Sequence, residues 1–473
     1  MPVFGWTLHG DGRTPPPGEV VRPGERLSWG RTLGIGVQHV VAMFGATFVF
    51  PIVMGLDPNL AVMLSGLATI VFLLIVGGKV PSYLGTSAAF VGATVAIRAA
   101  GGSSATVTGA ICVAGGVLAL VGLLVHLAGP RVIHAVFPPV VTGAVVLLIG
   151  FNLAPVVANT YWPQDQWVAL LTLAFVVLVS VLLRGFWSRI AVLLGLIFGF
   201  AVSWLFDLVF GQITSYSAAA DKVTTHWRVD LTQVANADWI GLPSFHAPDF
   251  KTSAILVALP GVIALIAENT GHVKAVSAMT GDNLNPVLGR ALLADGVTTA
   301  LASASGGAPT TTYAENIGVM AATRVYSTAA YWVAAVVAIL FGLCPKFGAL
   351  VAATPGGVLG GITVVLYGMI GLLGAKIWVE NRVDFGDPVN LVPVAAGVIA
   401  AIGNVTLYIT KSFPLSGIAL GTIIVIVAYH TLAIISRRRG SLTPGAGPPA
   451  AADPGGTATV VGDGPRRPDE ERG

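Results

Sequence analysis

Charged residues are almost absent from two long stretches of this chain, which flank a polar segment at 211–251. The chain has 25 basic and 22 acidic residues among 473, and 25 of these 47 lie in 1–31, 211–251 and 437–473. The other 364 residues carry only 22 charges, too few for a water-facing surface. We therefore predict an all-α, polytopic membrane protein rather than a soluble enzyme.

Several other functions have no support in the composition. The net charge of +3 gives no reason to expect a nucleic-acid partner. Cys112 and Cys344 both lie in apolar runs and are expected to be buried small hydrophobic residues. No cysteine or histidine spacing predicts a metal site. The N-terminal residues lack a basic patch followed by an apolar run, so no cleaved signal peptide is expected there.

Apolar runs of about 20 residues predict membrane-spanning helices. We expect fourteen, seven on each side of 211–251. The third and tenth are interrupted by Gly, Pro, Ser and Thr in GTSAAFVG (85–92) and GGAPTTTYAENIG (306–318). The predicted spans are 32–55, 58–77, 81–100, 104–128, 132–157, 166–184, 187–210, 253–274, 285–304, 309–323, 327–350, 355–373, 389–410 and 414–436.

Loop lysines and arginines predict the orientation in the membrane. With both termini in the cytoplasm, nineteen basic residues lie inside and six outside, as the positive-inside rule expects. The Pro- and Gly-rich tail at 440–473 is predicted to be disordered, and 211–251 is predicted to form a small external cap.

Two motifs recur in corresponding spans. Pro138-x-x-Val141-x-Gly143 returns 217 residues later as Pro355-x-x-Val358-x-Gly360, and Thr86-x-Ala88 returns 226 residues later as Thr312-x-Ala314. A repeat of seven spans must place its second copy upside down. Inverted repeats with interrupted helices are typical of secondary transporters, with the site at the interruptions.

Carboxylates inside predicted spans are the candidate functional groups, because burying them in the membrane is costly. Glu268 and Glu315 are predicted to be functional. Asp295 is predicted either to function directly or to brace unwound backbone. Asp207 is predicted to be a solvated helix end.

Glu268 and His272 are four residues apart on one helix face, a spacing that predicts contact and proton exchange. Tyr313, Glu315 and Asn316 lie in the interrupted tenth span, where helix N–H groups and carboxylate oxygens can meet a ligand. The ligand implied is small, neutral and rich in amide N–H and C=O groups, such as a pyrimidine or purine base. His39 is expected either to pack inside its helix or to contact substrate.

The motifs around these residues closely resemble those of the nucleobase–ascorbate transporter family, over about residues 30–436. In particular, ENIGVMAATR (315–324) fits the family signature, and Glu315 resembles the bacterial uracil and pyrimidine permease branch. The segments that carry the resemblance are QHVVAMFGATFVFP (38–51), PSYLGTSAAFVG (81–92), AENTGHVKAVSAMTGDN (267–283), LLADG (292–296) and TTTYAENIGVMAATRVYS (310–327).

The resemblance implies a seven-plus-seven inverted repeat, with short antiparallel strands in the third and tenth segments, and a homodimer. It also implies cytoplasmic tails at 1–30 and 437–473, an external loop at 211–251, and core and gate domains. The core would comprise 31–128 and 252–352, and the gate would comprise 129–210 and 353–436.

The resemblance further assigns roles to single residues. Glu268 and Glu315 would bind the uracil ring, and the backbones of Ala88 and Ala314 would contact its carbonyls. His272 would take part in proton coupling, supported by Tyr313 and Tyr367. Alanine stands at 88, where uracil permeases often have Phe, and at 314, where Gly is common; strict uracil selectivity is therefore not implied.

We therefore expect a plasma-membrane symporter that imports uracil or a related base, thymine or xanthine included, by alternating access. Protons would be the coupling ion, with no cofactor and no metal. The alternatives are an anion carrier of the same fold, a membrane-embedded enzyme and a pore. The enzyme is disfavoured, because no nucleophile or cofactor motif accompanies the two acids.

Overall fold

A computed structural model of the chain describes residues 4–15, 18–129, 137–217, 222–410 and 413–439. The chain divides into two units, Met1–Tyr429 and His430–Gly473, and each is described by itself. Only the end of one helix of the second unit belongs to the described residues. The predicted disordered tail lies outside them from residue 440 onward.

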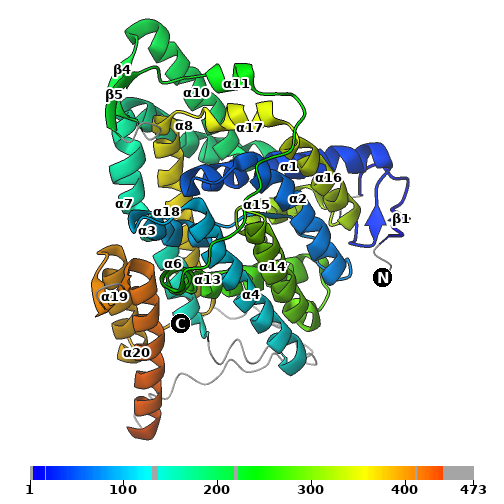
Figure 1. Ribbon diagram of the computed structural model, residues 1–473. Coiled ribbons are helices and arrows are strands. Elements are labelled where there is room, and N and C mark those ends of the chain that lie inside the picture. The colour runs from blue at the N-terminus through cyan, green and yellow to red at the C-terminus, as the bar shows by residue number, and fades with distance from the viewer. Residues whose placement is uncertain (1–3, 16–17, 130–136, 218–221, 411–412, 440–473) are drawn as a thin grey trace, which may run out of the picture. The chain divides into compact units, whose positions relative to one another are not determined.

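Helices dominate the first half of the chain (Figure 1). They follow the predicted spans, and the third predicted span is a strand followed by a short helix. The elements are α1 (Trp29–Met54), α2 (Pro58–Ile75), β3 (Leu84–Thr86), η1 (Ala88–Phe90), α3 (Val91–Ala99), α4 (Ser104–Ala128), α6 (Pro139–Phe151), α7 (Ala154–Val156), η2 (Val157–Tyr161), η3 (Trp162–Gln164), α8 (Gln166–Leu182), α9 (Phe186–Arg189) and α10 (Ala191–Phe210).

The second half repeats the pattern, with a strand and a short helix in the tenth predicted span. The elements are α12 (Thr252–Ala258), α13 (Pro260–Thr280), η4 (Asn285–Val287), α14 (Leu288–Ala304), β6 (Thr310–Thr312), α15 (Ala314–Thr323), α16 (Thr328–Gly342), α17 (Pro345–Ala352), α18 (Gly356–Glu380), α19 (Pro388–Ile402), β7 (Thr406–Thr410), β8 (Phe413–Ser416) and α20 (Gly417–Arg439).

Among the described residues, nine helical segments are long and apolar enough to cross a membrane. The pair α16 and α17, bent by 81°, makes a tenth. Three further apolar helices are shorter than a full span: Ala88–Ala99, α8 and α19. The chain is thus a multi-pass membrane protein, and the count of fourteen stays a prediction.

Short polar residues begin the helices, and glycines end them. The Asp57 carboxylate accepts the backbone N–H groups of Asn59 and Leu60 at the start of α2, as expected of an N-cap. Gly55 ends α1 and Gly281 ends α13, both in the left-handed conformation that glycine adopts without strain. These signals set the boundaries of helices whose interiors are uniformly apolar.

Close helix packing relies on small residues, as is usual within membranes. Helices α4 and α14 lie side by side (Figure 1). A Cβ at Gly115 of α4 would lie 2.6 Å from the backbone nitrogen of Ala300, whereas one at the neighbouring Gly116 would meet nothing within 4 Å. Gly115 therefore faces α14, and Gly116 faces away from it.

The N-terminal segment, predicted as a tail, is folded against the start of α16. Strands β1 (Thr7–Leu8) and β2 (Glu25–Arg26) pair in parallel. The Trp6 indole N–H donates to Thr328 Oγ1 at 2.8 Å, and the Val21 N–H donates to the Arg324 carbonyl at 2.9 Å. Backbone and side-chain hydrogen bonds thus order a stretch with no apolar periodicity.

The polar segment between the halves forms an antiparallel hairpin, β4 (Ile213–Ser217) with β5 (Lys222–His226), and a short helix, α11 (Thr232–Asn236). α11 packs on α17. Farther along, the Asp249 N–H donates to the Ala105 carbonyl at 2.8 Å. The segment therefore runs across several helix ends rather than forming a separate domain.

Candidate functional site

The two interrupted segments meet in a short antiparallel strand pair. β3 lies against β6 with Leu84 opposite Thr312, and every residue of both strands is buried. The Ser87 N–H also donates to the Pro309 carbonyl at 2.9 Å, which extends the pairing. Backbone groups that an unbroken helix would satisfy are thus satisfied across the interruption, as a membrane interior requires.

Threonine hydroxyls on neighbouring helices fix both strands. Thr69 of α2 accepts the Leu84 N–H at 2.9 Å. Thr299 of α14 donates to the Thr310 carbonyl at 2.7 Å. Each strand is therefore held by its own helix as well as by its partner.

A helix begins directly after each strand. Ala88 starts η1 and α3, and Ala314 starts α15 with Glu315 in its first turn. The first N–H groups of a helix have no partner within it and favour ligand oxygens. Ala314 is exposed, and Ala88 and Glu315 are partly exposed, although their neighbours in the strands are buried. Because the strands are antiparallel, the two helices start at opposite ends of the pair.

Helix α13 passes beside both interruptions, since it contacts η1, β6 and α15. Glu268 lies within electrostatic range of Asp295 and Glu315. Both Glu268 and His272 are partly exposed, on a helix that is otherwise mostly buried at this level. The structure thus brings the two predicted glutamates to one place, next to the helix starts.

His272 contacts the strand pair instead of its predicted partner. Its Nδ1 lies 2.8 Å from Thr312 Oγ1, and the described residues show no hydrogen bond between His272 and Glu268. Positions four apart on a helix share a face, but here the hydroxyl of β6 takes the imidazole nitrogen.

Asp295 lies behind strand β6 and is fully buried. Its Oδ2 accepts from Asn269 Nδ2 at 3.2 Å and from Thr311 Oγ1 at 3.4 Å. These contacts link α13, α14 and β6, which is a bracing arrangement of the kind that the sequence left as one alternative.

Asn316 points away from the exposed side of α15. Its Nδ2 lies 3.0 Å from the His39 carbonyl and 3.1 Å from His39 Nδ1, and both residues are fully buried. The His39 ring also packs on Tyr331, with 4.3 Å between the ring centroids. In this structure His39 and Asn316 join α1 to α15 and are not accessible to a ligand.

Tyr313 and Tyr367 lie in different places. Tyr313 is buried, and its hydroxyl donates to the Thr86 carbonyl at 2.8 Å. Tyr367 of α18 lines a cavity of about 440 Å³ together with residues of α6, α7, η2 and η3. That lining includes none of Glu268, His272 and Glu315, so the structure does not bring Tyr367 to the predicted proton-coupling group.

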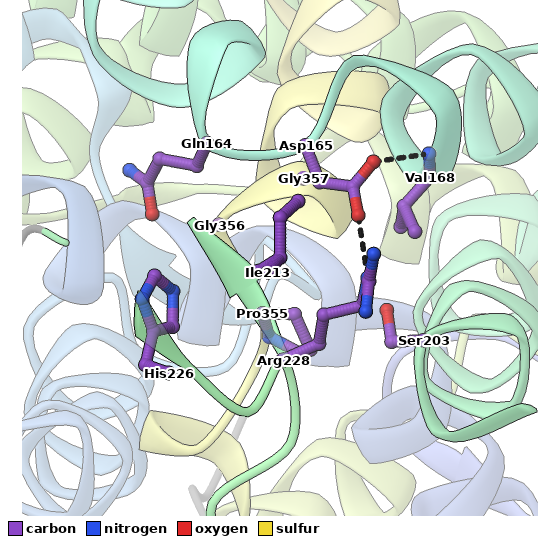
Figure 2. Close-up of a pocket in the computed structure, with 10 residues that line it drawn as sticks. All are labelled: Gln164, Asp165, Val168, Ser203, Ile213, His226, Arg228, Pro355, Gly356 and Gly357. Carbon is purple, nitrogen blue, oxygen red and sulfur yellow. Dashed lines mark hydrogen bonds and ion pairs between the residues drawn. The ribbon is translucent and has the colours of Figure 1, made fainter. Parts of the chain in front are cut away.

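A second polar cluster, which sequence reasoning missed, ties the hairpin to the ends of α8 and α10. Arg228 Nε donates to Asp165 at 2.7 Å and Nη1 to Asp207 at 3.1 Å, and all three side chains are at most 10% exposed. Figure 2 shows the guanidinium directed at Asp165, whose other oxygen accepts the Val168 N–H. The prediction that Asp207 is a solvated helix end is therefore wrong, because the hairpin covers it.

These features together define a class of protein. Interrupted spans that meet at a strand pair, with membrane-embedded carboxylates beside helix starts, are the architecture of a secondary membrane transporter. Among the described residues, no group of three or more His, Cys, Asp or Glu side chains is arranged to hold a metal ion.

Comparisons with known proteins give the family. Residues 30–410 match the profile described as the Permease family. The chain is 44% identical over 410 residues to the putative pyrimidine permease RutG of Escherichia coli K12, covering 85% of this chain and 90% of that one. It is 37% identical over 416 residues to the uracil permease of Bacillus caldolyticus, covering 85% and 91%. The chain therefore belongs to this permease family, the nucleobase–ascorbate transporters, as the sequence motifs predicted, and it is a transporter and not an enzyme.

A solved structure shares the fold. The murine anion transporter Slc26a9 in its inward-facing state matches with a TM-score of 0.62 at 11% identity, over 86% of this chain and 68% of that one. At this identity the likeness concerns the fold alone.

Proposed function

We propose that this permease imports uracil or a related pyrimidine across the plasma membrane, with protons as the coupling ion. The observation that carries the proposal is the placement of Glu268 and Glu315 together beside the starts of η1–α3 and α15. The names of the relatives, a pyrimidine permease and uracil permeases, support the same substrate class.

The chemistry of the site suits a pyrimidine base. Ring N–H groups of uracil need acceptors, which the carboxylates of Glu268 and Glu315 supply. Ring carbonyls need donors, which the first N–H groups at Ala88 and Ala314 supply. A neutral ring with alternating N–H and C=O groups satisfies both sets at once.

An anion carrier is the second candidate, and it is not favoured. The only observation in its favour is the fold shared with an anion transporter. Two glutamates beside the site would repel an anion of any size, since like charges in a low-dielectric environment interact strongly.

Proton coupling is proposed for the same group of residues. Three carboxyl groups within electrostatic range and a nearby imidazole can bind and release a proton as a coupled set. His272 contacts Thr312 next to the start of α15, so a change at the imidazole would be felt by the ligand-facing backbone. Asp295 reaches the same strand through Thr311.

Alternating access is proposed from the way the helices pack. Extensive contacts join α4 to α14 and α2 to α16, all within the predicted core. Equally extensive contacts join α18 to α6 and α8, all within the predicted gate. Movement of these two sets past each other would expose the site to each side in turn. We further propose cytoplasmic termini and a homodimer.

The test is proton-driven uracil uptake by membrane vesicles carrying Glu268→Gln. Loss of a charged hydrogen bond costs about 1.5–3 kcal/mol, so apparent affinity should fall roughly 10- to 100-fold and the pH dependence should flatten. Glu380→Gln is the matched control, because Glu380 is exposed and pairs only with Lys376 on its own helix. Unchanged accumulation with unchanged pH dependence would contradict the proposal.

A competition panel tests the substrate itself. Uracil, thymine, xanthine and bicarbonate are offered against labelled uracil at several pH values. The proposal expects competition by pyrimidines and none by bicarbonate, and the reverse result would support the anion carrier.

A further inference from the structure

Thr47 lies in the middle of α1, fully buried, with both of its polar groups turned toward the strand pair. Its Oγ1 donates to the Tyr313 hydroxyl at 3.2 Å. Its carbonyl accepts from Thr86 Oγ1 at 3.2 Å. The Tyr313 hydroxyl in turn donates to the Thr86 carbonyl at 2.8 Å. The three residues form a closed ring of hydrogen bonds, which we call the Thr47 ring.

The Thr47 ring joins three separate parts of the site. Thr47 belongs to α1, Thr86 is the last residue of β3 before η1, and Tyr313 is the residue directly before α15. The Tyr313 N–H also donates to the Tyr83 carbonyl, at the start of β3. The side chain of Tyr313 therefore runs along β3 from one end to the other.

Gly85 makes this path possible. A Cβ at Gly85 would lie 2.4 Å from Cζ of Tyr313 and 2.5 Å from Oγ1 of Thr47. Separations below 3 Å do not occur between such atoms, so no other residue fits without displacing the tyrosine. The absence of a side chain at position 85 is what lets the ring close over the strand.

Burial decides what the ring can do. Thr47 is fully buried, and Tyr313 is only 4% exposed. Neither hydroxyl is accessible to a substrate, although Ala314 next to Tyr313 is exposed. The ring therefore acts on a ligand only through the backbone that it holds.

We propose that Thr47 is a positioning residue of the substrate site, which fixes the start of α15 relative to the start of η1. The proposal rests on the proposed function of that site. If the N–H groups at Ala88 and Ala314 both meet one rigid planar ligand, their separation must be set before the ligand arrives. The Thr47 ring sets it, since it ties the residue before α15 to the strand before η1.

The test compares Thr47→Val, Thr47→Ser and Thr94→Val by KM and maximal rate of uracil uptake. Valine is nearly isosteric with threonine but lacks the hydroxyl. A lost hydrogen bond costs about 0.5–1.5 kcal/mol, so KM should rise roughly 2- to 10-fold, with the pH profile unchanged. Serine keeps the hydroxyl and should restore KM. Thr94 is the matched control: it is fully buried in α3, and its hydroxyl has no hydrogen-bond partner among the described residues.

A double-mutant cycle separates positioning from general damage. Tyr313→Phe removes two bonds of the ring, so adding Thr47→Val should raise KM no further. Multiplying effects, or a Thr47→Val KM equal to wild type, would overturn the proposal. If the wild-type chain takes up no uracil, and the purified protein binds no labelled uracil, the proposed function itself fails, whatever the variants do.

Discussion

Individual residues of the N-terminal segment show how a polar stretch is held in place. The Glu25 carboxylate accepts the Arg22 N–H at 2.9 Å and lies 2.9 Å from His9 Nδ1. Burial alone would raise the pKa of Glu25, but these hydrogen bonds outweigh burial and hold its pKa below the usual 4.5. A lowered carboxyl pKa in the folded state stabilises that state above pH 4.5, and the stabilisation is lost as the pH falls further.

The segment should therefore loosen below pH 4.5. Hydrogen exchange of the Val21 and Tyr326 amides, which bond to the Arg324 and Val21 carbonyls, should accelerate there beyond the intrinsic pH effect. Glu25→Gln should remove this extra pH dependence. Glu19→Gln should keep it, since Glu19 is mostly exposed and lies 3.6 Å from His9. Equal protection in wild type and Glu25→Gln at pH 4 would contradict the prediction.

At the level of elements, equivalent parts of the two halves recur at a constant offset. Gly55 and Gly281 end α1 and α13 in the same conformation, 226 residues apart. Thr86 and Thr312 end β3 and β6 at the same offset. The contacts of α4 with α14 and of α16 with α2 are related in the same way. These correspondences support the inverted repeat that two short motifs had indicated.

Neighbouring glycines on α4 test this packing. Gly115→Ala forces a methyl group against the α14 backbone, and overpacking of this kind costs about 1–3 kcal/mol. Gly116→Ala meets no atom and gains helix propensity of up to about 1 kcal/mol. Thermal unfolding in detergent should therefore show a lower Tm for the first variant and an equal or higher Tm for the second. Equal Tm values for both variants would show that α4 and α14 do not pack as described.

The sequence predicts the interruptions well, because Pro309 and the surrounding glycines cannot continue a membrane helix. It also predicts Glu268 and Glu315, since charge within lipid is costly. It does not predict the partners of Thr47, which lie 39 and 266 residues away. Threonine is common in these spans, and no local pattern marks one hydroxyl as a link between three elements. Only the packed structure can identify it.

For the whole molecule, the segment between the two halves matters most. Arg228 joins it to Asp165 and Asp207 with all three charges buried. Removing one partner of a buried ion pair leaves the others without compensation, at a cost of about 3–5 kcal/mol. The hairpin is thus part of the structural core at this end of α8 and α10.

Arg228→Met should therefore lower the Tm markedly. Lys251→Met is the matched control, because Lys251 pairs with Asp249 at 3.5 Å while both side chains are about half exposed. Such pairs contribute at most about 1 kcal/mol. A Tm for Arg228→Met as high as that of the control would mean that the cluster contributes little to stability.

The same segment also acts as a short tether. The Val229 N–H donates to Asp207 at the end of α10, and α11, which starts at Thr232, packs on α17. Only two residues, at about 3.3–3.6 Å each when extended, separate these attachments. The ends of α10 and α17 can therefore move apart by no more than about 7 Å before α11 leaves its place or Arg228 loses its partners. Any wider opening on this side has to be accompanied by a measurable rearrangement of the loop.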